Sequence, residues 1–275
     1  MEKRITSIKE HQEILYDLLY TLDDFCKKYN IRYFLAHGTL LGAVRHNGII
    51  PWDDDADVQM ERGEYERFKE LITTNPPKGY KGYHIDNTKG YYYPFMKFGK
   101  IGTRVIERDW KCVPAEGIGI NIDIFPIDGC PNDKVEAEKY VVEEMNKIFN
   151  NIHYWRNSEW KNFKGIKKKF FYILYWVRKR PIFLKPYLKR LYSETQQYKL
   201  KESEYYFSFW SFCGAKVMNS TKEIENLTYI KFGTRMLPIP IGYDAILRKQ
   251  YGDYMTPPPV EEQGSTHLQE LYVEV

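Results

Sequence analysis

The chain has 275 residues, of which 43% are hydrophobic and 16% aromatic, so it is long enough for one large domain or for a core with a helical extension. Its formal net charge of +4 argues against a nucleic-acid binder that acts through bulk charge, and its four cysteines lie too far apart for a CxxC zinc motif or a disulfide framework. With no apolar signal region at the start and no apolar run near the ~20 residues of a membrane-spanning helix, we expect a reduced, cytoplasmic protein at most peripheral to a membrane.

The first third of the chain predicts alternating helices and strands. Ser7 and Glu10 have the spacing of a capping box, and apolar residues at helical spacing follow them, which predicts a helix over about 8–29. Four shorter elements are predicted after it: a buried strand at 31–36 (IRYFLA), a helix at 38–46 (GTLLGAVRH), a strand at 55–60 (DADVQM) and a helix at 63–73 (GEYERFKELIT).

Further strands and then helices are predicted downstream. Residues 75–83 indicate a loop, 91–109 two short strands forming a hairpin around a glycine-rich turn, and 117–128 (GIGINIDIFPID) a strand with alternating isoleucines. From about residue 133 the pattern is mainly helical. This order predicts an α/β (α+β) fold: a mixed-sheet catalytic core in residues 1–132, and a mainly helical region in residues 133–275 that completes the site.

Closely spaced carboxylates provide the first chemical signal. Asp55 and Asp57 are two residues apart on a predicted strand, so their side chains are expected on the same face, where they can share a Mg²⁺ ion with phosphate oxygens. Asp123, on the later strand, supplies a third carboxylate, and three carboxylates around phosphates suit metal-assisted phosphoryl or nucleotidyl transfer. Asp53, Asp54 and Asp128 are interpreted mainly as turn residues or caps.

A phosphate-binding turn is the second signal. The residues HGT, 37–39, lie where a predicted strand turns into a helix, and a helix N-terminus offers N–H groups and a positive dipole end to an anion. Gly38 allows a phosphate to approach the backbone closely. An Asp-x-Asp pair or a Gly-Thr turn alone is common by chance, but this order of both signals on these elements favours a functional site.

Three motifs now identify a resemblance. GTLLGAVRHNGIIPWDDDADVQM (38–60) resembles the signature of the LicD family, NIDIFPIDG (121–129) resembles its later motif, and LPIPIGYDAILRKQYGDYMTPPP (237–259), with His267 beyond it, resembles its C-terminal motif. Bacterial members of that family transfer phosphocholine or other phosphodiester-linked substituents, and the related fukutin-related proteins use CDP-ribitol. The resemblance covers about residues 30–267, nearly the whole chain.

The resemblance implies a nucleotidyltransferase-like fold and a CDP-activated donor, with CDP-choline favoured. It implies that Asp55 and Asp57 are metal ligands for Mg²⁺ or Mn²⁺, and that Gly38 and Thr39 form the phosphate-contacting turn. Asp123 is the third carboxylate, which either holds metal as well or accepts the proton of the acceptor hydroxyl. The acceptor is then a sugar hydroxyl of a lipid-linked or cell-surface glycopolymer, such as teichoic acid or lipopolysaccharide, modified at the inner face of the plasma membrane.

Four further residues are candidates for substrate contacts. Lys97 and Arg104, on the predicted hairpin, are within reach of phosphates in this interpretation. Arg45 either contacts a phosphate or pairs with an acid. His267 is either an acid–base group or a structural residue.

Several alternatives remain open. One is a CDP-ribitol- or CDP-glycerol-dependent polyol-phosphate transferase, and another is a true nucleotidyltransferase that releases pyrophosphate. A third is a non-catalytic basic module that binds membranes or nucleic acid; it draws on residues 160–192, which hold eleven Lys or Arg and no Asp or Glu. That segment either docks on an anionic membrane or packs as a core helix. The acidic cluster argues against nucleic acid as the partner.

Overall fold

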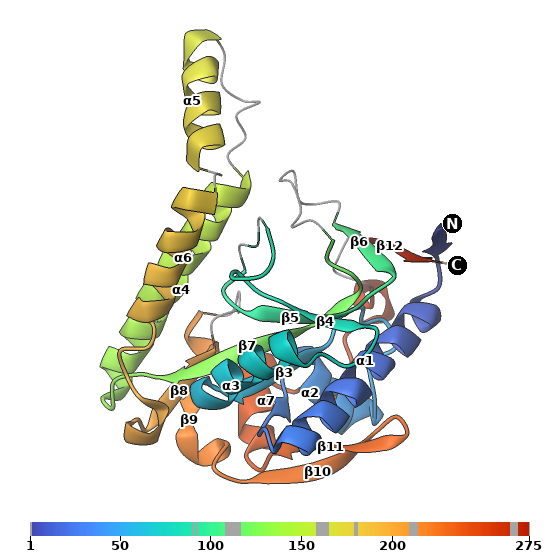
Figure 1. Cartoon of the computed structure of the whole chain (residues 1–275). Helices are drawn as coiled ribbons and strands as arrows, with labels where there is room; N and C mark the ends of the chain where they lie inside the picture. Colours follow the sequence, from blue (N-terminus) through green and yellow to red (C-terminus); the bar gives the residue numbers. More distant parts are fainter. Residues whose placement is uncertain are drawn as a thin grey trace.

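The structure is a computed structural model that describes residues 2–89, 91, 93–107, 117–157, 165–178, 181–208, 214–264 and 269–274. His267 and part of the basic segment 160–192 lie outside these residues. A central mixed sheet organises the fold (Figure 1). Its strands, in spatial order, are β2 (Phe34–Leu35), β3 (Asp57–Glu61), β7 (Asn121–Gly129), β5 (Met96–Lys100) and β4 (Tyr80–Tyr83), with β8 (Tyr205–Ser208) and β9 (Asn219–Ser220) continuing from β7.

Strands β3 and β7 run parallel, and the other pairs in this sheet are antiparallel. Together with the surrounding helices this mixed sheet confirms the expected α+β fold class. The strands predicted at 31–36, 55–60 and 117–128 form as β2, β3 and β7, but β2 is shorter than expected and β3 begins only at Asp57. Asp55 therefore lies in the segment before the strand, and its predicted place on the strand is wrong.

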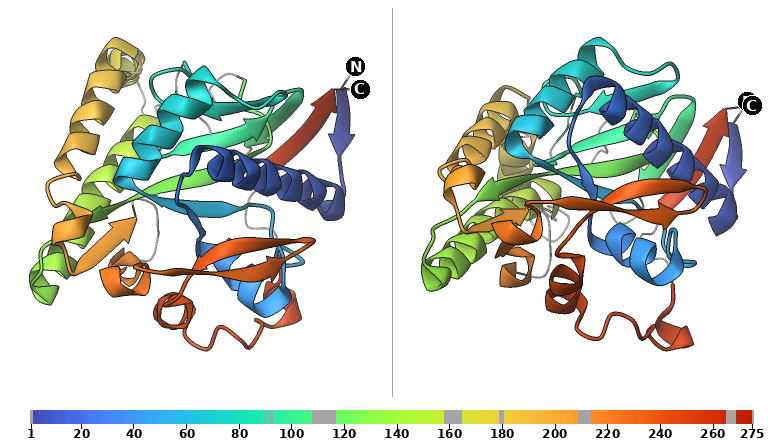
Figure 2. Two further views of the ribbon diagram at one scale, coloured as in Figure 1. Left: turned by 60° about the horizontal axis from the view of Figure 1, so that its bottom comes forward. Right: turned by 90° about the horizontal axis from the view of Figure 1, so that it is seen from below.

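Helices α1 (Ile8–Tyr29) and α3 (Arg62–Thr74) cover one face of this sheet (Figure 2). Their apolar stripes, which include Leu22 and Phe68, pack in one core with Val58 and Ile124 of the sheet, so the helical periodicity correctly predicted both elements. The predicted capping box is wrong: Ser7 is the N-cap of α1 but makes no side-chain capping hydrogen bond, because the partner of the Glu10 carboxylate is Lys3, at 2.8 Å.

The remaining strands form two small sheets. Strands β10 (Leu227–Phe232) and β11 (Arg235–Pro240) form a hairpin, and β1 (Glu2–Ile5), β12 (Gln269–Glu274) and β6 (Thr103–Glu107) form a three-stranded sheet that places the two ends of the chain side by side (Figure 2). The predicted hairpin over 91–109 is therefore wrong, because β5 and β6 both form but join different sheets. The predicted loop at 75–83 contains β4.

Helices α2 (His37–His46) and α7 (Tyr243–Tyr251) contact each other beside the central sheet, and three helices follow β7. These are α4 (Lys134–Asn157), α5 (Gly165–Arg178) and α6 (Pro181–Glu194). In the part of the chain that the structure describes, short 3-10 helices lie at Leu200–Glu202, Gly214–Val217, Thr221–Glu223 and Val260–Glu262. The proposed boundary at residue 132 stays a prediction; Tyr206 and Phe232 of the second part pack in the same core as α1 and β3. None of the helices in the described ranges is long and apolar enough to cross a membrane.

Candidate active site

Three chemically important side chains share one register across neighbouring strands of the central sheet. Asp57 on β3 pairs with Asp123 on β7, and Asp123 pairs with Lys97 on β5; we call Asp57, Asp123 and Lys97 the carboxylate row. Because side chains alternate along a strand, the row points away from the face on which Val58 and Ile124 pack against α1 and α3. The sheet topology thus brings together residues that lie 66 positions apart in the chain.

Negative charge accumulates around Asp57. Burial raises the pKa of the Asp57 carboxyl well above its usual range, and the charges of Asp55, Asp123 and Asp53 raise it further, whereas Lys97 opposes the shift. Asp55 therefore acts on Asp57 electrostatically although it lies before the strand. Among the described residues, no group of three or more His, Cys, Asp or Glu side chains is arranged so that it can hold a metal ion.

Lys97 is the cation of the row. Its Nζ donates to Asp123 Oδ1 at 2.6 Å and to Asn121 Oδ1 at 3.1 Å, so two residues of β7 hold it. The same ammonium lies 4.6 Å from the ring centroid of Tyr93 and 5.5 Å from that of Phe95, which is cation–π distance. The sequence analysis missed these two rings; their spacing, two and four residues before Lys97, was the available signal.

The first turn of α2 is tied directly to the row. The backbone N–H of Asp57 donates to Thr39 Oγ1 at 2.7 Å, and the N–H of Ala36, the N-cap of α2, donates to the Asp57 carbonyl at 3.1 Å. A Cβ on Gly38 would lie 3.0 Å from Asp53 Oδ2, so the glycine lets this carboxylate approach the helix N-terminus, where the helix dipole favours negative charge. The structure thus places Gly38 and Thr39 beside the carboxylates, as the sequence predicted.

A neutral histidine lies on the row's side of the sheet. His37 Nε2 is 3.3 Å from Gln59 Nε2, and its ring meets Phe125 edge-on with centroids 5.4 Å apart. Burial lowers the pKa of His37 to about 4, although a hydrogen bond with Gln250 of α7 opposes the shift, so the imidazole is uncharged near neutral pH. Gln59 was missed by the sequence analysis; its position two residues after Asp57 puts it on the same strand face.

The two predicted substrate arginines lie in different places. Arg45, in the last turn of α2, donates to the Tyr254 carbonyl at 2.8 Å and lies 6.0 Å from the ring centroid of Trp52, so it joins α2 to the C-terminal motif. Arg104 is on β6 in the three-stranded sheet, where its guanidinium donates to Glu2 at 2.9 and 2.5 Å. The structure therefore pairs Arg104 with another strand of that small sheet rather than with the row.

Of the three aspartates interpreted as structural, Asp128 and Asp54 interact with groups outside the row, whereas the charge of Asp53 acts on Asp57. The Asp128 carboxylate accepts two hydrogen bonds from Arg62 of α3, at 2.9 and 2.5 Å. Asp54 is buried, and its charge acts on His11 of α1. The loop that carries Asp53 and Asp54 is held by Gln12, whose Nε2 donates to the Asp53 carbonyl at 2.8 Å.

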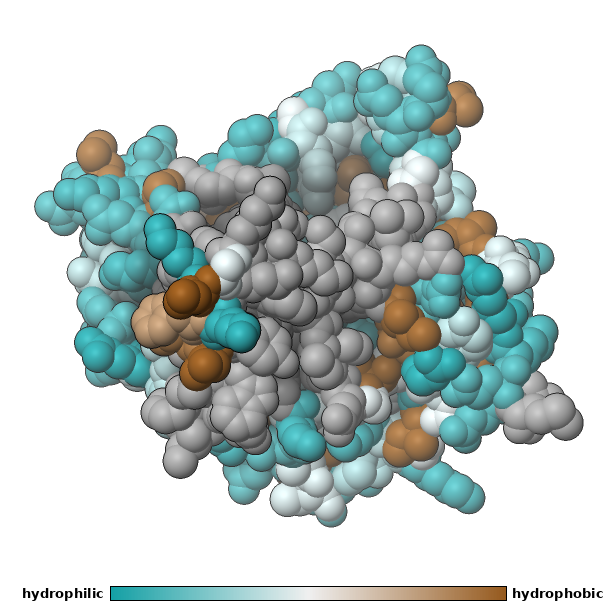
Figure 3. Space-filling view, turned by 90° about the horizontal axis from the view of Figure 1, so that it is seen from above, coloured by the Kyte–Doolittle hydropathy of each residue, from teal (hydrophilic) through white to brown (hydrophobic). Residues whose placement is uncertain are grey.

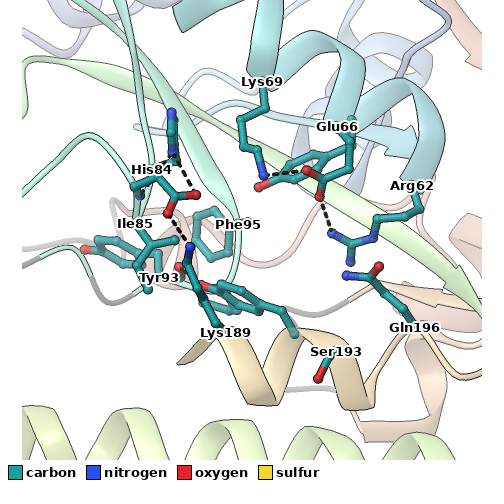
Figure 4. Close-up of a pocket in the computed structure, with 14 residues that line it drawn as sticks. Arg62, Glu66, Lys69, His84, Ile85, Tyr93, Phe95, Lys189, Ser193 and Gln196 are labelled. Carbon is teal, nitrogen blue, oxygen red and sulfur yellow. Dashed lines mark hydrogen bonds and ion pairs between the residues drawn. The ribbon is translucent and has the colours of Figure 1, made fainter. Parts of the chain in front are cut away.

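A cavity of about 370 Å³ opens between α3 and α6 (Figure 4). Tyr93 and Phe95 form part of its wall and also contact Lys97, so these two rings are shared by the cavity and the row. Charged side chains on the cavity wall pair with each other, as Lys189 does with Asp86 at 2.9 Å. The cavity is therefore formed where the helical region packs against the sheet.

Comparisons with known proteins agree with this geometry. Residues 30–170 match the family model described as LicD/FKTN/FKRP, nucleotidyltransferase domain. The chain is 29% identical to the lipopolysaccharide cholinephosphotransferase LicD of Haemophilus influenzae over 98% of this chain and 99% of that protein. It is 40% identical to an uncharacterised protein of Rickettsia typhi over 28% of this chain and 24% of that protein. It is 31% identical to mannosyltransferase regulator 4 of Saccharomyces cerevisiae over 30% of this chain and 7% of that protein. Since the matched region contains the whole carboxylate row and the α2 turn, the chain belongs to the LicD family.

Proposed function

We propose that the protein transfers phosphocholine from CDP-choline to a sugar hydroxyl of a cell-surface glycopolymer, lipopolysaccharide or teichoic acid. The observation that carries the proposal is the carboxylate row: Asp57 and Asp123 at one register, beside the N-terminus of α2. The end-to-end similarity to a lipopolysaccharide cholinephosphotransferase supports the choline and the glycan acceptor.

The donor's pyrophosphate belongs, in this proposal, at the turn formed by Gly38 and Thr39. The helix dipole and the N–H groups of the first turn of α2 favour an anion there. The neighbouring carboxylates repel the same anion, so a divalent cation is needed between them. The donor set fits Mg²⁺ or Mn²⁺ because Asp55 and Asp57 offer hard oxygen ligands. Burial raises the pKa of Asp57, and the charges of Asp55, Asp123 and Asp53 raise it further against the opposing charge of Lys97. When bound, the cation would neutralise charge on the transferred phosphate.

The reaction is a displacement at the phosphorus that carries choline. The acceptor's hydroxyl oxygen forms the new P–O bond, the bond between that phosphorus and the bridging oxygen breaks, and CMP leaves with the electron pair. We assign the hydroxyl proton to Asp123, whose side chain is partly exposed, whereas the side chains of Asp57 and Lys97 are nearly buried. Lys97 holds the Asp123 carboxylate in position at 2.6 Å. Positioning and charge neutralisation then supply most of the rate.

The test is product analysis with three donors. Purified protein is incubated with CDP-choline, CDP-ribitol or CDP-glycerol and a glycan acceptor, with Mg²⁺, with Mn²⁺ and with a chelator, and the released nucleotide is measured. CMP from CDP-choline in the presence of metal is the expected result. CMP released only from CDP-ribitol or CDP-glycerol would show that the protein is a polyol-phosphate transferase. Pyrophosphate release from a nucleoside triphosphate would identify a true nucleotidyltransferase. The Asp57→Asn protein is the control for contaminating hydrolases.

A further inference from the structure

Helix α5 exposes an apolar stripe. Ile166, Phe170 and Ile173 have side chains that are 87%, 60% and 59% exposed, although large apolar residues of a soluble protein are usually buried. At about 100° per residue, their spacing places all three within a sector of about 60° on one side of the helix. Figure 1 shows α5 extending beyond the rest of the molecule, and Figure 3 shows apolar side chains among hydrophilic ones on the face from which it extends.

Exposed lysines flank this stripe. Lys167 and Lys169 are both exposed, and helical geometry places them on opposite sides of the Ile166–Ile173 line. An apolar stripe with a lysine on either side is the arrangement of a helix that lies in a lipid–water interface, where the lysine stems follow the apolar surface and the ammonium groups reach anionic headgroups.

The basic residues of α6 are already used within the protein. Lys185 and Lys189 both pair with Asp86, at 3.3 and 2.9 Å, and Arg190 pairs with Glu194 at 3.0 Å (Figure 4 draws Lys189). The two lysine contacts tie α6 to the loop after β4, and the Arg190–Glu194 pair lies within α6. Within the described part of segment 160–192, the basic residues of α6 therefore pair with the protein's own carboxylates, whereas Lys167 and Lys169 of α5 are exposed.

We propose that α5 docks the protein on an anionic phospholipid surface, with Ile166, Phe170 and Ile173 facing the acyl chains. The helix has 14 residues, about 21 Å, which is too short to cross the ~30 Å apolar layer, so it lies in the surface. Charge selects this partner over a second copy of the chain: the segment 160–192 has no acidic residue, so two copies of α5 would meet lysine to lysine. The proposal does not depend on the transferase chemistry.

Co-sedimentation of the full chain with vesicles tests the docking. We expect binding to vesicles of phosphatidylglycerol and phosphatidylcholine that weakens as salt is raised, and much weaker binding to phosphatidylcholine alone. Replacing both lysines (Lys167→Gln, Lys169→Gln) should lower the partition coefficient about 25-fold, since each basic residue near such a surface contributes about fivefold. Ile166→Ser with Ile173→Ser should lower it about a hundredfold.

A matched pair of substitutions provides the control. Val135 and Ile241 are similarly exposed but lie on other elements, so Val135→Ser with Ile241→Ser should bind vesicles like the wild type. Circular dichroism and CMP release with a soluble acceptor should be unchanged in all variants, because none of these residues is in the site. The proposal is overturned by no binding at low salt, by equal binding to neutral vesicles, by α5 variants that bind like the wild type, or by a dimer that the isoleucine variants abolish.

Discussion

Strand β7 carries two aspartates on opposite faces, and each pairs with a cation of low exposure. Asp128 is 3% exposed and accepts two hydrogen bonds from one guanidinium, that of Arg62. The Asp123 side chain is 21% exposed and accepts one hydrogen bond, at 2.6 Å, from Lys97. The first pair is bidentate and its carboxylate is closed to solvent, whereas the carboxylate of the second is partly exposed and shares its register with Asp57.

The difference shows how one strand separates stability from chemistry. A bidentate arginine–carboxylate pair balances its charge one to one and leaves nothing for a ligand. Around Asp57, by contrast, the charges of Asp55, Asp123 and Asp53 add to the burial that raises its pKa, and Lys97 opposes them. In the proposed reaction, a bound metal ion would offset this negative charge.

The largest effect is expected at Asp57. The variant Asp57→Asn should lower CMP release about 10³-fold or more, because it removes a metal ligand in the proposed site. It should also raise the melting temperature of the metal-free protein by roughly 2 °C or more, since it relieves carboxylate repulsion. Asp55→Asn should lose activity similarly. Wild-type turnover at saturating donor in either variant would remove that residue from the site.

On the other face, Asp128→Ala should change stability instead. The Arg62 guanidinium then loses both hydrogen bonds to Asp128 and keeps a longer contact, 3.4 Å, with Glu66, which should cost up to about 3–5 kcal/mol of unfolding free energy in urea titrations. The double variant Arg62→Leu, Asp128→Leu should recover much of the loss, and its turnover at 15 °C should be near that of the wild type. A turnover defect in a stably folded double variant would contradict the structural role of this pair.

The effect of Asp123→Ala on turnover is expected to fall between those of Asp57→Asn and Asp128→Ala. Turnover should drop about 10²-fold, while the affinity for CDP-choline, measured by calorimetry, should change little, because the donor phosphates are assigned to the α2 turn. Lys97→Met, which keeps the length of the side chain, should also lower turnover by misplacing Asp123. If Asp123→Ala unfolds, or remains fully active, the contrast with Asp128 disappears.

The smallest effect concerns the acid side of the pH range. Burial lowers the pKa of His11 to about 4 although Asp54 opposes the shift, so between pH 6.5 and 4 the unfolded chain binds a proton that the folded chain does not. The stabilisation from neutral His11 is complete above pH 6.5 and is lost as the pH falls, by about 1.4 kcal/mol per pH unit. His11→Gln should reduce this slope in urea titrations at pH 7 and pH 5. Equal slopes of unfolding free energy against pH in the wild type and the variant would contradict this role of His11.

Local patterns predicted the parts of this molecule that local forces determine. The helices α1, α2 and α3 follow from apolar periodicity, and the turn at Gly38 was located from residue types alone. Pairing across long sequence separations was not predictable in this way: β6 was assigned to β5 by proximity, but its partner is β12, far along the chain. Likewise the Tyr93 and Phe95 contacts to Lys97 depend on where β5 enters the sheet, which no local pattern specifies.

The three-stranded sheet has a consequence for how the chain is made. Its middle strand, β12, leaves the ribosome after both β1 and β6, and both of these strands pair with it. Until residues 269–274 emerge, the edges of β1 and β6 lack these hydrogen bonds, and the loop that joins β1 to β12 spans almost the whole sequence. Closing such a loop is slow, because its entropy is lost before any contact compensates. This small sheet should therefore form as a late step of folding, after the strands of the central sheet have emerged.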